Sequence, residues 1–434
     1  MFKFYARVLM LGIALFAAIL QSATEARAQG IVLPGVGPVN RSMSGAATAA
    51  PLDAAGALQW NPGSISALKG NQILFGVEFI DSQTELSSSL PAALGGASGS
   101  TDSNSGIKTL PTIALVWKPD DSPWTFGLGA LGIGGFGVDY KASTTNPILS
   151  APPIGTGALY SRLGILQIVP TAALQLTDNL SVGFSPTVTI ADLQLDPFFA
   201  ANPDDANGDT VFTYPSAVNT RNFWGLGFQV GAYLTTESNW NFGVSYKSPQ
   251  WFERFQFNST NELGVPRNLS IETQFPAIYS LGTSYTGFDG WLLAFDMRYI
   301  DYKSTDVFGD PVGFTQTGAS TGLGWRNVFS FITAAQYQVT DLVSVRGGYM
   351  YNQNPIPESA TAANIQSSAL YEHSMSLGAS MAMSRSMVMH LAWVHSFELT
   401  STGRYLTPTG PIPDSSVSIQ QTNNAITAGL TVKF

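Results

Sequence analysis

The chain has 434 residues, of which only 11% are charged, 12% are aromatic and 43 are glycine, and its formal net charge is −9. Soluble domains carry about 25% charged residues, so the composition argues against an ordinary soluble protein. The acidic balance argues against nucleic acid as a partner, because binding it would require a basic face. Without cysteine, we expect no lipoprotein anchor, no disulfide and no thiolate chemistry.

The N-terminus has the organisation of a secretory signal. Lys3 and Arg7 form a basic start, an apolar run follows over Val8–Leu20, and residues 26–28 (Ala-Arg-Ala) satisfy the small-x-small rule of signal peptidase. The apolar run is shorter than the about 20 residues that a membrane-spanning helix needs. We therefore expect residues 1–28 to be a signal peptide.

Residues 29–70 do not alternate as a strand does. They are rich in glycine and alanine, and short helices are possible at residues 43–50 and 62–68. A segment of small residues that coils tightly ahead of the first strand is a candidate plug. The alternative interpretation is a disordered periplasmic tail.

Residues 71–434 repeat a two-residue alternation of apolar and small or polar side chains. Leu180 and Val182, for example, alternate with Ser181 and Gly183. No apolar run in this part would make a spanning helix, and in hydrocarbon every backbone amide must be paired, which leaves a closed β-barrel. An even number of antiparallel strands closes such a barrel. We predict fourteen, at residues 71–81, 110–118, 124–138, 164–176, 180–194, 222–235, 240–254, 271–286, 291–302, 326–338, 342–352, 371–383, 387–400 and 421–434.

The connections alternate between short turns and long loops, as in outer-membrane barrels with periplasmic turns and extracellular loops. The predicted long loops cover residues 82–109, 140–162, 196–221, 255–270, 303–325, 353–370 and 401–420. The last strand alternates up to a terminal aromatic residue, Phe434, which favours a barrel over a soluble sandwich. We expect Phe434 to be the contact with the barrel assembly machinery.

Three groups of motifs resemble the FadL/TodX family of outer-membrane long-chain fatty acid and hydrocarbon transporters. The N-terminal group comprises residues 37–49 (GPVNRSMSGAATA), 53–56 (DAAG) and 61–63 (NPG), where the family has Asn-Pro-Ala in place of the last triplet. The others lie at residues 224–248 and at residues 345–357, which contain VRGGY and NPIP. The resemblance covers nearly the whole chain that follows the signal.

The resemblance implies an all-β fold, a 14-stranded antiparallel barrel plugged by an N-terminal hatch at residues 29–70. It also implies passive uptake of hydrophobic small molecules, namely long-chain fatty acids or hydrocarbons, across the outer membrane of a Gram-negative cell. A ligand would settle between the extracellular loops, move to an inner site near the hatch, and leave sideways through the wall at the third strand. Membrane lipid and lipopolysaccharide would surround a monomeric barrel, with no cofactor and no metal.

Aromatic residues of two extracellular loops are candidates for ligand binding, since such clusters usually mark an interaction surface. They are Phe198, Phe199, Phe212, Trp251, Phe252, Phe255 and Phe257. For Trp251 and Phe252 an aromatic girdle at the membrane interface is an equal alternative. Arg346 could bind a ligand carboxylate, although an ion pair with an acidic residue of the lumen, such as Asp296, is the favoured interpretation.

The predicted hatch and gate residues fall into three groups. They lie at the start of the mature chain, in the NPG triplet and among the glycines of the third strand. Glycine within a strand often marks a bulge or kink. The predicted residues are Gly30, Ile31, Val32, Leu33, Asn61, Pro62, Gly63, Gly132, Gly134 and Gly135. The match of residues 127–132 to a G-x-G-x-x-G nucleotide motif is discarded, because no βαβ context follows.

Other functions remain open at this point. A barrel enzyme would need a nucleophile beside a base, and the chain offers only His373, His390 and His395, with no serine at suitable spacing on the inward face beside His390. We therefore predict no catalytic residue. A general diffusion porin or an adhesive barrel is the second alternative, and a plug at residues 29–70 would argue against an open pore.

Overall fold

The computed structural model describes residues 30–219 and 221–434, so the predicted signal peptide at 1–28 lies outside the described residues. Within them, fourteen antiparallel strands close into one barrel, with β1 paired to β21. The seventh strand is β8 continued by β9, and the eighth is β12 continued by β13. The barrel strands are β1 (Gln72–Ser89), β3 (Lys108–Trp117), β4 (Trp124–Tyr140), β5 (Leu159–Gln175), β6 (Leu180–Asp196), β7 (Phe223–Thr235), β8 (Trp240–Lys247), β9 (Gln250–Phe252), β12 (Gln274–Phe275), β13 (Ala277–Tyr285), β14 (Trp291–Asp301), β15 (Val328–Gln338), β16 (Val343–Asn352), β17 (His373–Ala382), β18 (Met387–Gly403) and β21 (Ser416–Lys433).

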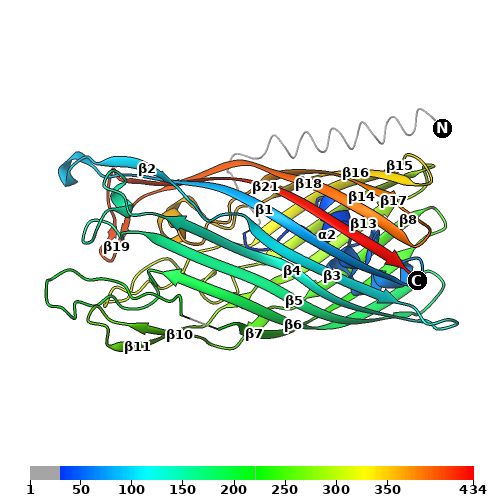
Figure 1. Ribbon diagram of the computed structural model, residues 1–434, viewed down its shortest axis with the longest axis horizontal. Helices are drawn as coiled ribbons and strands as arrows, with labels where there is room; N and C mark the ends of the chain where they lie inside the picture. Colours follow the sequence, from blue (N-terminus) through cyan, green and yellow to red (C-terminus); the bar gives the residue numbers. More distant parts are fainter. Residues whose placement is uncertain (1–29, 220) are drawn as a thin grey trace.

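Short turns gather at the end of the barrel that holds the C-terminus, and the long loops gather at the opposite end (Figure 1). The loops contain β2 (Ser98–Asp102), β10 (Phe255–Thr260), β11 (Pro266–Ile271), β19 (Leu406–Thr407), β20 (Gly410–Pro411), η2 (Ala92–Leu94), η3 (Pro147–Leu149) and η4 (Glu358–Asn364). No helix in the described ranges is long and apolar enough to cross a membrane.

The two faces of the wall differ as the alternation predicted. On β14, Leu293 and Phe295 are exposed on the outside, whereas Asp296 and Arg298 are fully buried inside. An apolar exterior suits lipid, and a polar interior can hydrogen-bond to whatever fills the lumen. The prediction of a fourteen-stranded barrel is confirmed.

Some predicted strand ends are wrong by several residues. The ladder between β1 and β21 runs on to the pair Ser89–Ser416, well beyond the predicted ends at 81 and 421. The outward side chains of these added residues are polar, so the sequence predicts a loop there, whereas Leu86, Val417 and Ile419 are buried on the inward face. Polarity there marks the end of the apolar belt, and the hydrogen-bonded wall continues past it.

The N-terminal segment, residues 30–70, packs inside the barrel, towards the end with the short turns (Figure 1). It forms α2 (Gly37–Ser42), α3 (Ala54–Trp60) and η1 (Pro62–Ala67). The helix predicted at 43–50 is wrong, because Ser44 and Gly45 have positive φ and end α2 in a turn. Asp53 is the N-cap of α3, and its side chain accepts a hydrogen bond from the amide of Gly56 (3.0 Å).

Candidate ligand path

An ion pair on β14 fixes the N-terminal segment to the wall. Arg298 donates to the carbonyl of Pro34 (2.9 Å) and to that of Gly45, and its guanidinium lies 3.3 Å from the ring centroid of Trp60. Asp296 pairs with Arg298 (3.1 Å) and accepts hydrogen bonds from both the amide (3.0 Å) and the hydroxyl (2.7 Å) of Thr48. Buried charges are stable only with such partners, so this cluster holds the segment in one position.

The predicted Asn-Pro-Gly triplet is a second attachment. The Asn61 side chain donates to the carbonyls of Thr48 (2.8 Å) and Ala232 of β7 (2.9 Å) and accepts from the amide of Gly63 (3.0 Å). A Cβ on Gly63 would lie 2.9 Å from the carbonyl of Gly231, so the turn needs glycine to approach the wall. On the far side of the segment, Arg41 pairs with Glu78 of β1, and both side chains are buried.

The start of the described chain pairs with the third strand of the barrel, β4. Leu33 donates to the carbonyl of Ile133 (2.9 Å), and Gly135 donates to the carbonyl of Ile31 (3.1 Å), with Val32 opposite Gly134 as an antiparallel bridge. The register of β4 against β5 shifts between Gly132 and Gly134, so a β-bulge lies among the glycines that were predicted as a gate.

Two tyrosines hold the same short strand from the other side. The Tyr371 hydroxyl donates to the carbonyl of Val32 (2.6 Å), and the Tyr302 hydroxyl accepts from the Val32 amide (3.3 Å). Burial raises the pKa of both hydroxyls, so both stay protonated and able to make these bonds. Residues 31–33 are therefore bonded on both edges.

Beside this strand, the backbone pairing between the barrel strands β3 and β4 is interrupted. Pairing between β3 and β4 ends at Thr112–Leu131, while Lys108–Pro111 continue along β1 and Gly132–Tyr140 continue along β5. Among the described residues, backbone hydrogen bonding between the two edges returns farther on, where the amide of Asn104 donates to the carbonyl of Asp139 (2.8 Å). Between these points the two edges diverge.

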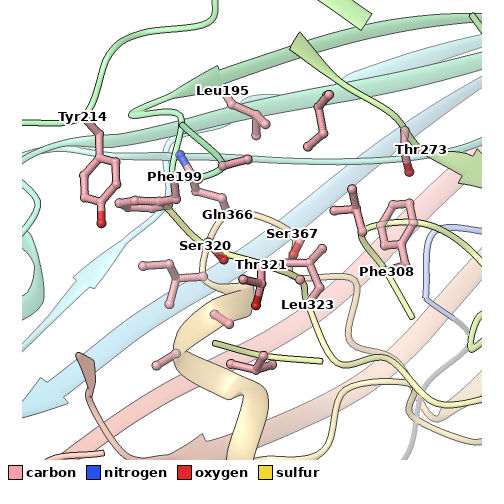
Figure 2. A pocket seen from close by; sticks show the side chains of 18 of the residues that line it. Leu195, Phe199, Tyr214, Thr273, Phe308, Ser320, Thr321, Leu323, Gln366 and Ser367 are labelled. Carbon is pink, nitrogen blue, oxygen red and sulfur yellow. The ribbon is translucent and has the colours of Figure 1, made fainter. Parts of the chain in front are cut away.

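A first cavity, cavity 1, has a volume of about 520 Å³ and lies among the loops, where Figure 2 shows Leu195, Phe199, Phe308 and Leu323 around it. Its other walls come from the ends of β4, β5, β6 and β9 and from the segment after η4. Among the described residues, no charged side chain lines it. An apolar solute can therefore enter without removing a charge from water.

A second cavity, cavity 2, has a volume of about 490 Å³ and lies deeper, between the N-terminal segment and the diverging edges of β3 and β4. It touches Ile107–Leu110 on one edge and Gly134–Gly137 on the other. Unlike cavity 1 it has cationic walls, from Arg41, Lys108 and Arg162, and none of the lining residues in the described part of the chain carries a carboxylate.

The predicted aromatic residues do not act as one group. Phe199, Phe252 and Phe255 line cavity 1. Phe198 and Phe257 lie behind its wall, in a buried aromatic cluster with Phe223.

The two remaining predicted aromatics, Phe212 and Trp251, are exposed at 62% and 49% and do not line either cavity. The exposure of Trp251 on β9 fits the girdle alternative.

The predicted role of Arg346 finds no support from its position, since it lines neither cavity. It donates to Gln336 (2.6 Å) and Ser380 (2.6 Å) on the strands beside it. Asp296, the acid named as its possible partner, pairs with Arg298 instead. The charge near Arg346 is instead Asp53: burial raises the pKa of that carboxyl to about 6, opposed by the Gly56 amide and by Arg346.

A serine–histidine contact exists that the spacing of these residues in the sequence did not predict. Ser380 of β17 lies 2.6 Å from Nδ1 of His390 of β18. The other ring nitrogen, Nε2, contacts the hydroxyl of Thr431 (2.9 Å), where a catalytic triad would place a carboxylate. Because Ser380 also accepts a bond from Arg346, the contact belongs to a buried hydrogen-bond network of the wall.

Other wall residues of the path carried no signal in the sequence. Phe136, Leu163, Phe275 and Phe308 line cavity 1, yet each lies in a stretch that reads as ordinary strand or loop. Only the register of neighbouring strands and the course of the loops bring them together.

Taken together, a closed barrel with an internal segment and two cavities leading to its wall defines a transport channel of the outer membrane. Residues 18–434 match the family described as outer membrane protein transport protein (OMPP1/FadL/TodX). The chain belongs to this family, whose members carry hydrophobic small molecules across the outer membrane. Comparison with curated protein sequences gives no significant match.

Solved structures of the same fold are distant in sequence. The toluene transporter TodX of Pseudomonas putida is 17% identical, with a TM-score of 0.68 over 94% of this chain and 100% of that one. The toluene transporter TbuX of Ralstonia pickettii is 19% identical, with a TM-score of 0.67 over 93% and 99%. A FadL homologue of Pseudomonas aeruginosa is 14% identical, with a TM-score of 0.69 over 93% and 100%.

Proposed function

We propose that this protein takes up hydrophobic small molecules by diffusion, through cavity 1, cavity 2 and the diverging edges of β3 and β4. The observation that carries the proposal is the position of residues 31–33. They line the inner side of the divergence and hydrogen-bond to the β4 bulge, so they close the path where it reaches the wall. The residues 29–70 then act as a hatch whose first few residues move.

The energetics of this path need no external source. Burying an apolar group the size of a Phe or Leu side chain gains about 1.5–3 kcal/mol. Cavity 1 offers that gain to an incoming solute, and a lateral exit offers it again in the lipid. The lateral exit also spares the solute a passage through the polar lumen around Asp296 and Arg298.

The gate is weak enough to open when a ligand arrives. Residues 31–33 are held by two backbone hydrogen bonds to β4 and two tyrosine contacts, each worth roughly 1 kcal/mol. A ligand that fills cavity 2 and displaces Ile31 or Leu33 can offset most of this. Asn61, Pro62 and Gly63, together with the Arg298 cluster, keep the remainder of the hatch in place.

Phe199, Phe252 and Phe255 are the aromatic residues that we assign to the ligand. The relatives of known structure include two toluene transporters, so single-ring hydrocarbons are one candidate class. Lys108 of cavity 2 would also accommodate a fatty acid carboxylate, whereas Arg41 and Arg162 already pair with Glu78 and Asp192. We further propose that the barrel is a monomer without enzymatic activity, that lipopolysaccharide surrounds it, and that Phe434 is read by the assembly machinery.

Uptake of labelled toluene and labelled oleate by a deletion strain, with and without this gene, tests the proposal. We expect the gene to raise uptake of at least one of them and to leave uptake of a labelled sugar unchanged. Planar bilayers containing the purified protein should be nearly silent, since the lumen is filled. Equal uptake of both compounds in the two strains would exclude the function, and a large steady conductance would favour a porin.

A further inference from the structure

The bulge in β4 changes which side chains of that strand face the lumen. Before the bulge, Thr125 and Leu131 are buried and face inwards. After it, Val138 and Tyr140 are buried, so the inward set has shifted from odd to even residues. Because side chains alternate strictly along a strand, one extra residue moves Phe136 from the lipid side to the lumen.

Phe136 then lies between the two cavities. Its cross-strand neighbour on β5 is Leu163. Three side chains, those of Phe136, Leu163 and Ile31, line both cavity 1 and cavity 2. Two of them belong to the paired strands β4 and β5 of the wall, and Ile31 belongs to the strand that moves when the proposed gate opens. Together they form a partition that a ligand must pass.

A direct route down the barrel is closed by polar groups beneath cavity 1. The Lys247 ammonium donates to Gln167 of β5 (3.0 Å) and to Gln59 of α3 (3.0 Å). Gln167 donates in turn to Thr189 of β6 (3.0 Å), which donates to Gln250 of β9 (2.9 Å). An apolar solute crossing this layer would leave buried polar groups unpaired, at a cost of about 1–3 kcal/mol each.

The floor and the walls of cavity 1 share strands. Gln167, Thr189 and Gln250 each lie two residues from a residue that lines the cavity, on the same face of the strand. The polar layer therefore begins where the apolar lining stops, and the partition is the apolar way out.

We infer that Phe136 and Leu163 determine the specificity of transport, by setting the width of the passage from cavity 1 to cavity 2. This inference rests on the proposed function. The passage admits narrow apolar molecules, such as single aromatic rings or unbranched chains, and retains fused polycyclic ones in cavity 1.

Uptake of labelled toluene and labelled phenanthrene by the complemented deletion strain tests this inference. Phe136→Ala should raise phenanthrene uptake about tenfold or more, since one or a few methylene groups in a tight apolar passage are worth that much, and should change toluene uptake less than about twofold. Phe136→Trp should lower uptake of both. The matched control is Phe126→Ala, on the same strand but exposed on the outer face.

The outcomes separate the two proposals. No toluene or oleate uptake by the wild type would overturn the proposed function and this inference with it. Toluene uptake by the wild type, with the same phenanthrene-to-toluene ratio in Phe136→Ala and Phe126→Ala, would overturn the partition alone. If Phe136→Ala fails to fold, as heat modifiability on a gel would show, Leu163→Ala should give the same change in ratio.

Discussion

Replacing Gly134 by alanine should release the N-terminal strand from the barrel wall. A Cβ at this position would lie 2.5 Å from the carbonyl oxygen of Ile31, and backbone cannot yield as a flexible side chain does. The strand must move away, and the hydrogen bonds of Ile31 to Gly135 (3.1 Å) and of Leu33 to Ile133 (2.9 Å) are then lost. At about 1 kcal/mol for each bond the loss is about 2 kcal/mol. That corresponds to an increase of about 30-fold in the open population.

Cysteine labelling measures this population. The chain contains no cysteine, so Val32→Cys, at a buried position that lines neither cavity, provides a single thiol that a maleimide in the medium can reach only when the strand has moved. We expect the labelling rate to rise about 30-fold when Gly134→Ala is added. The same gain should shorten the time to half-maximal toluene uptake.

Gly164 supplies the matched control. It lies opposite Gly135 on β5, and a Cβ there would have no atom within 4 Å. Gly164→Ala should therefore leave the labelling rate unchanged within about twofold. If Gly134→Ala and Gly164→Ala label at the same rate, residues 31–33 are not held by β4 in the way described.

Three further expectations concern the hatch and cavity 1. Arg298→Ala leaves the buried Asp296 carboxylate without its partner and should destabilise the packed hatch by about 3–5 kcal/mol, which faster proteolysis of the hatch would show. As a control, Arg254→Ala removes an exposed ion pair and should cost under about 1 kcal/mol. Burial raises the pKa of the Asp53 carboxyl to about 6. The protonated carboxyl therefore contributes its full stability below the ordinary pKa of about 3.9, and this contribution is lost as the pH rises through 6. The thermal unfolding midpoint should fall over that pH range, and Asp53→Asn should abolish the fall. Phe199→Ala should weaken binding of toluene to the purified protein about 5- to 30-fold, while Phe212→Ala, outside the cavity, should leave the affinity unchanged.

Much of the barrel wall was predictable, because the alternation of side chains within each strand shows which of them face lipid. Leu293 and Phe295 had to face lipid and Asp296 and Arg298 had to face away from it, whatever the neighbouring strands did. The strand count and the placement of turns follow from such local periodicity. The strand ends were less predictable, since the polar residues around Ser89 are compatible with both a loop and a wall above the lipid.

The site was predictable only in part. The glycines of the third strand pointed to an irregularity, and Asn61 pointed to a tight turn. Both signals are local, because each of these backbone conformations favours the residue type found there. The aromatic residues gave a looser signal. Phe199 and Phe198 are adjacent in sequence, yet one lines cavity 1 and the other supports it from behind, since adjacent side chains diverge.

By itself the sequence determined that this chain closes into a barrel with an apolar outer surface, preceded by a segment of small residues. The reason is that the alternation of apolar and polar side chains can be read within each strand. The tertiary structure alone decided the path through it. One inserted residue at the β4 bulge reverses the faces of everything that follows, so Phe136 enters the lumen beside Ile31, more than a hundred residues away in sequence. No local pattern encodes that encounter, because it depends on the register between strands and on where the N-terminus packs.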